Sequence, residues 1–328
     1  MPQSEPKKIV YLFGAGATHA ELGDLDTTVK EKKQGLLIKH VSARVIEKAR
    51  RRADYLKGVE MVSATTGSLN IELLISLIEN SKIYGWERKT GLLKELVRQD
   101  IEAILTRSRT NHFFLHKALF ELHGRKMIKG KEKLIGLISL NYDDVLDQAY
   151  KHYYGAPNYC FSLERTPEST HIPLLKLHGS FNWRGKRIRG KIRTIEIIPL
   201  GSNKNYLHAP YNFIWNRAME VLVECDTLRV VGCSLSQNDA HLIDLLFKAH
   251  LERKKAFDIE LIASQETGEE IRRNYGFFPK IKALTEIEGQ LVPDPTPSNA
   301  FKTWLKYKAT DMIGDNMRRS QYLKIVTT

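Results

Sequence analysis

The chain has 328 residues, of which 42% are apolar, so it is long enough to bury one large core or two modest ones. No apolar run approaches the about 20 residues that a membrane-spanning helix needs, and the N-terminal "MPQSEPKK" lacks the apolar segment of a secretory signal, so we expect neither and place the protein in the cytoplasm without membrane contact. The 51 Lys and Arg residues outnumber the 38 Asp and Glu residues for a formal charge of +13, which favours an anionic ligand, an acidic partner or nucleic acid without selecting one of them.

The first predicted element is a short apolar strand at residues 9–13, followed by the turn "GAGAT" at residues 14–18. Gly14 and Gly16 have no Cβ atom, so the backbone can turn sharply and its amides can approach an anion at the start of the next helix. His19 stands where the dinucleotide-binding pattern has its third glycine, and no acidic residue closes a second strand about 20 residues later. A phosphate cradle and a plain bend both fit this stretch, and we expect His19 to face solvent or to open the helix.

Residues 24–125 carry apolar residues at helical spacing and predict at least three helices inserted after the first strand. In the segment "SLNIELLISLIENSKIYGW", Ser68 and Asn70 are candidate caps for the start of a helix. The apolar face expected for that helix consists of Leu69, Leu73, Leu74, Leu77 and Ile78.

Strands alternate with helices through the rest of the chain. Apolar strands are predicted at residues 135–140, within 172–180, within 227–239 and in "DIELIAS", with helices at 240–253 and from about Glu266. This alternation predicts an α/β fold, a Rossmann-like parallel sheet flanked by helices, with an inserted helical subdomain. The basic segment at 184–204 interrupts the pattern and fits either a small hairpin or a loop.

The expected domain organisation is one large domain and a short tail. Residues 1–291 are predicted to form the Rossmann-like domain, including the helical insertion at 24–125. The proline-rich "VPDPTPSN" then marks a joint, and residues 292–328 are predicted to form a C-terminal helical tail.

Polar signatures follow the predicted strands directly, and parallel strands bring their carboxyl ends to one edge of a sheet. An amide such as Asn141 can hold a water or a ribose hydroxyl there, and a carboxylate such as Asp143 can orient it or stabilise positive charge. His178 fits either a structural or a catalytic group. Asp144 and Asp147 are expected to cap or solvate the first turn of the next helix.

Taken together and in this order, "GAGAT", "SLNYD", "KLHGS" and "GCSLSQND" resemble the motifs of the sirtuin superfamily, and specifically of its bacterial sirtuin-like branch. The likeness extends over about residues 8–264. It implies a Rossmann-like NAD pocket and, for this branch, hydrolysis of NAD in anti-phage defence.

The resemblance implies binding roles for residues in two of these motifs. Those expected at the pyrophosphate are Gly14, Ala15, Gly16 and Thr18. Those expected at the turn on the adenosine side are Gly232, Ser234 and Leu235. The Asp-Phe-Arg triplet of the sirtuin cofactor loop is missing, and Asp24 and Asp26 are the candidates to replace it.

Three catalytic residues are also implied by the resemblance. Asn141 matches the asparagine that positions the attacking water, and Asp143 matches the aspartate beside the nicotinamide ribose. His178 matches the catalytic histidine that contacts a ribose hydroxyl and can deprotonate it.

The cysteine pattern argues against a metal site. Cys160, Cys225 and Cys233 form no C-x-x-C pair, so we expect buried, reduced thiols and no structural zinc or other metal. Deacylating sirtuins hold zinc with two such pairs after the catalytic histidine, so the resemblance points away from peptide deacylation.

The main hypothesis is therefore an NAD hydrolase that cleaves its substrate NAD to nicotinamide and ADP-ribose as the effector of a bacterial anti-phage defence complex. Two alternatives stay open: a zinc-free transferase of acyl or ADP-ribosyl groups, and a non-enzymatic module that binds NAD or ADP-ribose within an assembly. The resemblance further implies a homo-oligomer and a HerA-type ATPase or Argonaute partner, while the basic clusters leave direct binding of nucleic acid open.

Overall fold

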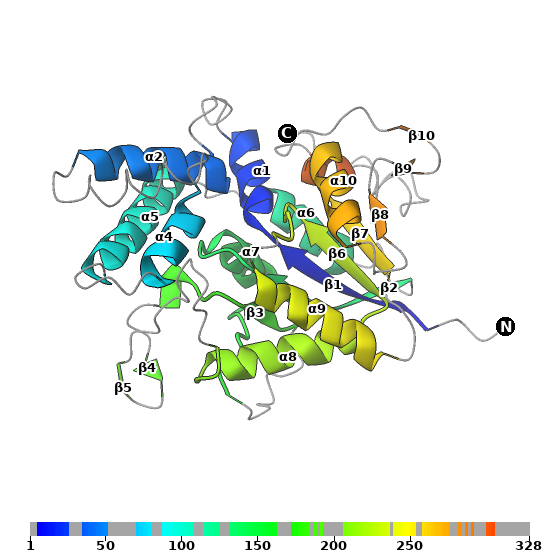
Figure 1. The fold of residues 1–328 in the computed structure, drawn as a ribbon. Coiled ribbons are helices and arrows are strands. Elements are labelled where there is room, and N and C mark those ends of the chain that lie inside the picture. The colour runs from blue at the N-terminus through cyan, green and yellow to red at the C-terminus, as the bar shows by residue number, and fades with distance from the viewer. Residues whose placement is uncertain are drawn as a thin grey trace.

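A six-stranded parallel sheet forms the centre of the protein (Figure 1). The computed structural model describes residues 5–25, 35–51, 70–80, 87–107, 114–124, 131–162, 172–183, 187–188, 191–192, 206–236, 239–253, 258–275, 281–283, 286–287, 290–291 and 300–305. The strands of the sheet are β1 (Lys7–Phe13), β2 (Glu132–Ser139), β3 (Leu174–Lys176), β6 (Thr227–Val231), β7 (Asp258–Ile262) and β8 (Ile281–Ala283). Their order, β3-β2-β1-β6-β7-β8, is that of a doubly wound dinucleotide-binding fold, which confirms the predicted α/β class.

The central strand β1 sets the level at which the neighbouring strands end. Residues 9–13 are fully buried, as their unbroken apolar run predicts. Phe13 lies opposite Ser139 of β2 on one side and opposite Val231 of β6 on the other. The chain runs outward from β1 in opposite directions along these two neighbours, so the carboxyl end of β1 is the switch point where open parallel sheets bind ligands.

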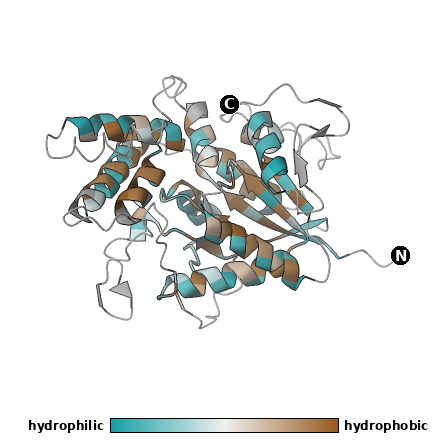
Figure 2. Cartoon of the chain, in the orientation of Figure 1, coloured by the Kyte–Doolittle hydropathy of each residue, from teal (hydrophilic) through white to brown (hydrophobic). Residues whose placement is uncertain are grey.

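Helices flank the sheet and turn their apolar residues toward it (Figure 2). They are α1 (Ala15–Leu25), α6 (Phe114–Gly124), α7 (Val145–Tyr154), α8 (Tyr211–Glu224), α9 (Ala240–Glu252) and α10 (Gln265–Asn274). α6 packs against α7 and α8 against α9, and Figure 1 shows the latter two side by side. The strand and the two helices predicted between residues 240 and 275 are confirmed.

Three further helices of the predicted insertion share an apolar cluster of their own. They are α2 (Ile38–Arg50), α4 (Ile71–Asn80) and α5 (Glu87–Arg107), grouped at the left of the sheet in Figure 1. α6 follows them in the chain but packs into the main core through Leu115, Leu119 and Phe120. The limits predicted for the helical insertion, 24–125, and for the C-terminal tail, 292–328, stay predictions.

The apolar face of α4 differs from the expected one. Its buried residues are Ile71, Leu74, Ile75 and Ile78, whereas Leu77 is 39% exposed; Leu69 lies outside the described residues. α2 and α5 pack on the side chains spaced 3, 4 and 7 residues from Ile71, so the predicted face was rotated by part of a turn. The Asn70 cap is confirmed, because its Oδ1 accepts from the Glu72 amide at 2.9 Å; Ser68 lies outside the described residues.

Small elements complete the described part of the chain. The basic segment forms an antiparallel hairpin of β4 (Arg187–Ile188) and β5 (Lys191–Ile192), and a second pair joins β9 (Glu286–Ile287) to β10 (Gln290–Leu291). Residues 300–305 are helical and bring Phe301 and Trp304 against the rings of Phe13 and Tyr11. None of the helices in the described ranges is long and apolar enough to cross a membrane.

Candidate active site at the switch point

The glycine motif brings the start of α1 into direct contact with the segment after β6. The Gly16 amide donates to the Gly232 carbonyl oxygen at 2.8 Å, and the Gly14 amide donates to Val231 at 3.0 Å. A Cβ atom at Gly16 would lie 2.7 Å from the Gly232 oxygen, and Gly232 itself has a φ of +56°. Glycine is therefore required at both positions for close packing of α1 on β6.

This contact changes how the glycine motif serves a ligand. α1 begins at Ala15, so the expected turn at residues 14–18 is largely the first turn of the helix. Two of its amides are already bonded to the β6 side, which leaves the exposed Ala15 and the N-terminal end of the α1 dipole as the part that can meet an anion.

Asn141 and Asp143, which follow β2, are bonded to the same first turn of α1. The Asn141 side-chain amide donates to the Gly14 carbonyl oxygen at 2.9 Å and to Thr18 Oγ1 at 3.1 Å. Thr18 Oγ1 in turn donates to Asp143 Oδ2 at 3.1 Å. The structure thus joins predicted residues that are more than 120 positions apart in the sequence.

The carboxylate of Asp143 is buried, and its charge depends on its neighbours. Burial raises the pKa of Asp143, and the nearby Asp147 carboxylate raises it further. The Lys176 ammonium, the Val145 amide and the Thr18 hydroxyl lower it, but the net shift is upward. The Val145 amide donates to Asp143 Oδ1 at 3.1 Å, which fixes the carboxylate at the start of α7.

His178 lies buried after β3, beside a carboxylate to which the sequence analysis gave no role. Its Nε2 is 3.1 Å from Asp239 Oδ2. The other oxygen, Asp239 Oδ1, accepts from the Leu242 amide at 3.4 Å and caps α9. Asp239, the last residue of "GCSLSQND", therefore orients the histidine. Its position directly before a predicted helix could have indicated a cap and hence a fixed carboxylate at this edge of the sheet.

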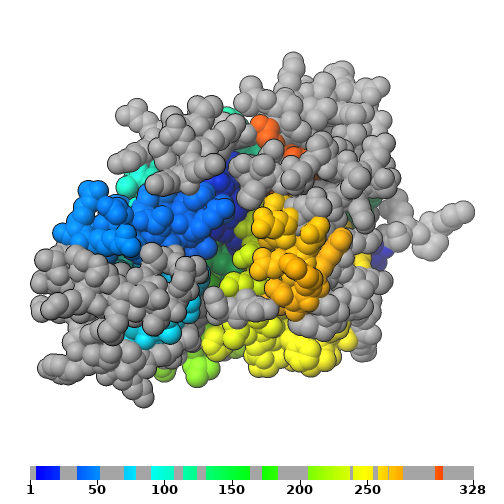
Figure 3. Space-filling model, turned by 45° about the horizontal axis from the view of Figure 1, so that its top comes forward, coloured from blue at the N-terminus to red at the C-terminus, as the bar shows by residue number. Residues whose placement is uncertain are grey.

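The loop between β6 and α9 has a defined shape. Leu235 has a φ of +45°, which an L residue adopts only when its surroundings impose it. The Tyr275 hydroxyl donates to the Leu235 carbonyl oxygen, and Ser234 stands exposed beside it. In the space-filling view the surface is hollowed between α2 and α10, with segments that follow β2 and β6 at its floor (Figure 3).

Residues 136–275 match the family model of the SIR2-like domain. The SIR2-like segment contains Asn141, Asp143, His178 and the loop that begins at Gly232, whereas the glycine motif of β1 and α1 lies before it. No curated protein matches the chain.

Solved structures of Sir2 homologues are similar at low identity. A triple mutant in complex with 2'-O-acetyl ADP ribose is 14% identical, with 96% of this chain and 97% of that chain covered and a TM-score of 0.39. A Sir2 homologue in complex with NAD is 15% identical, with 93% and 91% covered and a TM-score of 0.37.

Two expectations near the candidate site were wrong, and a third holds in part. Asp147 does not solvate the first turn of α7 but is buried and accepts from Lys176 Nζ at 2.8 Å. The expectation for Asp144 holds in part: it is half-buried at the N-cap position, and its carboxylate bonds the Gln148 side chain rather than a backbone amide. His19 does not face solvent: it is 8% exposed, and its ring packs against that of His40 at 5.6 Å between centroids.

The candidates for the cofactor loop and the three cysteines were also predicted from the sequence. Asp24 lies in α1, and Asp26 lies outside the described residues. All three cysteines are free; burial raises the pKa of Cys225 and of Cys233 to about 12, so neither is a thiolate nucleophile near neutral pH. Within the described ranges, no three His, Cys, Asp or Glu side chains gather to hold a metal ion.

Proposed function

We propose that the chain hydrolyses the N-glycosidic bond of NAD and releases nicotinamide and ADP-ribose. Two polar groups after neighbouring strands carry the proposal. The Asn141–Thr18–Asp143 chain follows β2, and the His178–Asp239 pair stands after the adjacent β3, with the His178 ring 6.1 Å from that of Tyr142. The match of residues 136–275 to the SIR2-like domain supports NAD as the ligand.

Binding would use the end of α1 and the loop after β6. The pyrophosphate would lie at Ala15, where the helix dipole favours negative charge, and Gly14, Gly16 and Thr18 would hold that turn in place. On the adenosine side, Ser234 would offer an exposed hydroxyl, with Gly232 setting the course of the loop. No metal is needed for this binding mode.

The reaction needs little acid catalysis, because the nicotinamide ring of NAD is already cationic and leaves as a neutral molecule. Water attacks C1 of the ribose, and the C–N bond breaks with its electron pair passing to nicotinamide. The attacking water releases one proton to bulk solvent. Asn141 uses its amide nitrogen to hold α1, so its oxygen is the atom that orients the water.

His178 and Asp143 stabilise the charge that develops on the sugar. The imidazole polarises a ribose hydroxyl, and Asp239 holds the ring in one orientation while balancing the charge it gains. Asp143, fixed by Thr18 and Val145, supplies negative charge for the oxocarbenium-like centre.

The decisive comparison is NAD consumption by the purified protein and by His178→Ala and Asn141→Ala. Both variants should lose at least about 100-fold in kcat, as expected for groups that act on the reacting atoms. His208→Ala, which removes an exposed histidine just before α8, is the matched control and should retain activity. Equal consumption by all four proteins would show that the site is placed wrongly.

The two other classes give different results in the same assay. A transferase would consume NAD only with an acylated or nucleophilic acceptor present, and a binding module would bind ADP-ribose without turnover and tolerate loss of His178.

We further propose that activity in the cytoplasm is controlled by assembly, as suits an NAD-depleting effector of anti-phage defence. A homo-oligomer, joined by a HerA-type ATPase or an Argonaute protein, is the assembly that the motif resemblance suggests. Size-exclusion chromatography with light scattering, on the protein alone and with the product of a neighbouring gene, tests this; a fully active monomer would contradict it.

A further inference from the structure

A lysine at the end of β3 is completely buried behind the proposed site. Lys176 is 0% exposed, and its Nζ lies 2.8 Å from Asp147 Oδ2 of α7. Moving an ammonium and a carboxylate out of water is costly, and such a pair is weak evidence for stability by itself. Its position beside the site therefore calls for another explanation.

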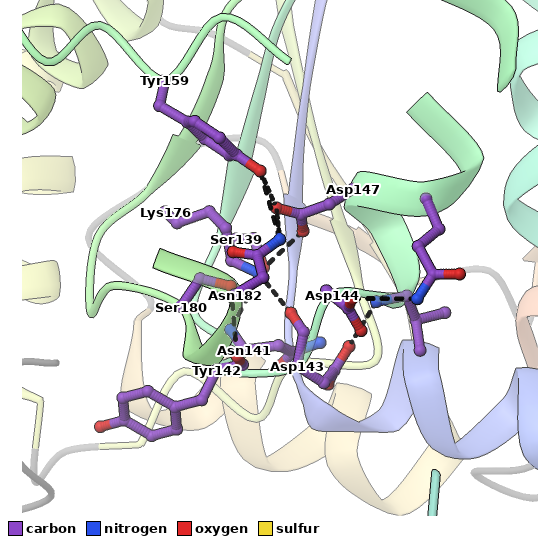
Figure 4. A network of polar contacts seen from close by, with 12 residues as sticks. Ser139, Asn141, Tyr142, Asp143, Asp144, Asp147, Tyr159, Lys176, Ser180 and Asn182 are labelled. Carbon is purple, nitrogen blue, oxygen red and sulfur yellow. Dashed lines mark hydrogen bonds and ion pairs between the residues drawn. The ribbon is translucent and has the colours of Figure 1, made fainter. Parts of the chain in front are cut away.

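The partners of Asp147 hold this pair in one geometry (Figure 4). Asp147 Oδ1 accepts from the Tyr159 hydroxyl at 2.5 Å and from the Asn182 side-chain amide at 3.2 Å. The carboxylate thus has partners from the 3-10 helix Phe181–Trp183, from the segment after α7 and from β3. A network with this many bonds fixes the direction in which the lysine points.

The second bond of Lys176 reaches the proposed active site. Its Nζ also donates to the backbone carbonyl oxygen of Asp143. That bond sets the backbone position from which the Asp143 carboxylate reaches Thr18 Oγ1 and the Val145 amide, each at 3.1 Å.

We propose that Lys176 is a positioning residue that fixes Asp143 against α1 and keeps a positive charge beside its carboxylate. The proposal rests on the proposed function, since it gives Lys176 its part through Asp143, but its geometry is independent of any substrate.

The charges around Asp143 give this role a measurable consequence. The groups that act on it are Lys176 of β3, Thr18 of α1, and the Val145 amide and Asp147 of α7. Lys176 opposes the increase in the pKa of Asp143 that burial causes. Loss of the lysine charge should therefore raise the pKa of Asp143 and extend its protonated form to higher pH.

The informative variant removes both charges of the pair. Lys176→Met alone leaves Asp147 buried without its cation and can fail to fold, whereas Lys176→Met/Asp147→Asn keeps the shape of both side chains and no net buried charge. Arg44→Met/Asp100→Asn is the matched control, because it removes a part-buried ion pair between α2 and α5 that is not among the groups acting on Asp143.

Two readouts separate this inference from the proposed function. Carbon-13 NMR titration of the Asp143 carboxyl, assigned with Asp143→Asn, should show a midpoint at higher pH in the Lys176→Met/Asp147→Asn protein than in the wild type or the control. The direction is upward because the Lys176 ammonium lowers the pKa of Asp143 more than the Asp147 carboxylate raises it. The acid limb of kcat/KM for NAD hydrolysis should move in the same direction.

An unchanged Asp143 midpoint in the folded double variant would overturn the role of Lys176. A wild-type protein that consumes no NAD would overturn the proposed function alone, because the NMR titration needs no turnover.

Discussion

Replacing Gly232 by alanine should separate α1 from the end of β6 and so open the candidate site. A Cβ atom at this position would lie 2.2 Å from the Ala17 amide nitrogen and 2.4 Å from the Gly16 carbonyl carbon. Both are backbone atoms, so no side-chain rotation relieves the overlap, and the φ of +56° is itself unfavourable for alanine.

The cost has two parts. The left-handed conformation costs an alanine about 1–2 kcal/mol, and forcing an extra carbon into a packed contact costs about 1–3 kcal/mol, so Gly232→Ala should lower the free energy of unfolding by about 2–5 kcal/mol. Urea unfolding followed by circular dichroism measures this change, and calorimetric titration with ADP-ribose measures the weaker binding that a displaced α1 should cause.

Gly91→Ala provides the matched control. Gly91 lies in α5, where an added Cβ atom would have nothing within 4 Å, and alanine there should raise the free energy of unfolding by about 0.5–1 kcal/mol without affecting ADP-ribose binding. If Gly232→Ala unfolded and bound ADP-ribose like the wild type, the reasoning about the α1–β6 contact would be refuted.

Three other predictions concern the surroundings of the site. Asp239→Asn should lower kcat for NAD at least about tenfold while keeping the α9 cap, whereas Asp239→Ala should also lose about 1 kcal/mol of stability. If the kcat of Asp239→Asn equalled that of the wild type, Asp239 would not be needed to orient His178. Gly35→Ala should lower the free energy of urea unfolding by about 1–3 kcal/mol, since the added Cβ would lie 2.2 Å from His19 Cε1. Adding His19→Ala to the same chain should recover part of this loss. If the stability changes of the two single variants simply added up in the double variant, the contact would be contradicted. Burial, together with the nearby charges of His40 and Lys39, lowers the pKa of His19 to about 4. The unfolded chain therefore binds this proton at a higher pH than the folded protein does, and the free energy of unfolding should fall by up to about 3 kcal/mol as the pH drops from about 6.5 towards 4. The same decline in a His19→Gln protein would show that His19 is not its cause.

The sheet and the composition of its polar edge could be predicted because their signals are local. A strand buried on both faces reads as a continuous apolar run, and residues 9–13 show it. The polar residues that follow each strand then meet by topology alone, so Asn141, Asp143 and Thr18 were expected to share a site before any contact was known.

The supporting charges could not be predicted, because their partners are distant in sequence. Lys176 and Asp147 are 29 positions apart and Arg229 and Glu132 are 97 apart, and a lone charge inside an apolar strand does not reveal which carboxylate the fold will place beside it. Asp147 was expected to cap or solvate the first turn of the next helix, because it continues from the strand end into that helix.

His19 shows the same limit at the surface of α1. Periodicity places it on the helix, but its burial depends on His40 of α2, which follows 21 residues later and packs against its ring. A local sequence pattern cannot predict this contact, because other residues set the angle at which the two helices pack.

The central claim, that this site hydrolyses NAD, is tested most directly by the products of the wild-type protein in the absence of any acylated or nucleophilic acceptor. Chromatography of the reaction, on the purified protein alone and together with the product of a neighbouring gene, should show nicotinamide and ADP-ribose formed in equal amounts as NAD disappears. NAD that is bound but not consumed in either sample, or consumed only after an acceptor is added, would contradict it.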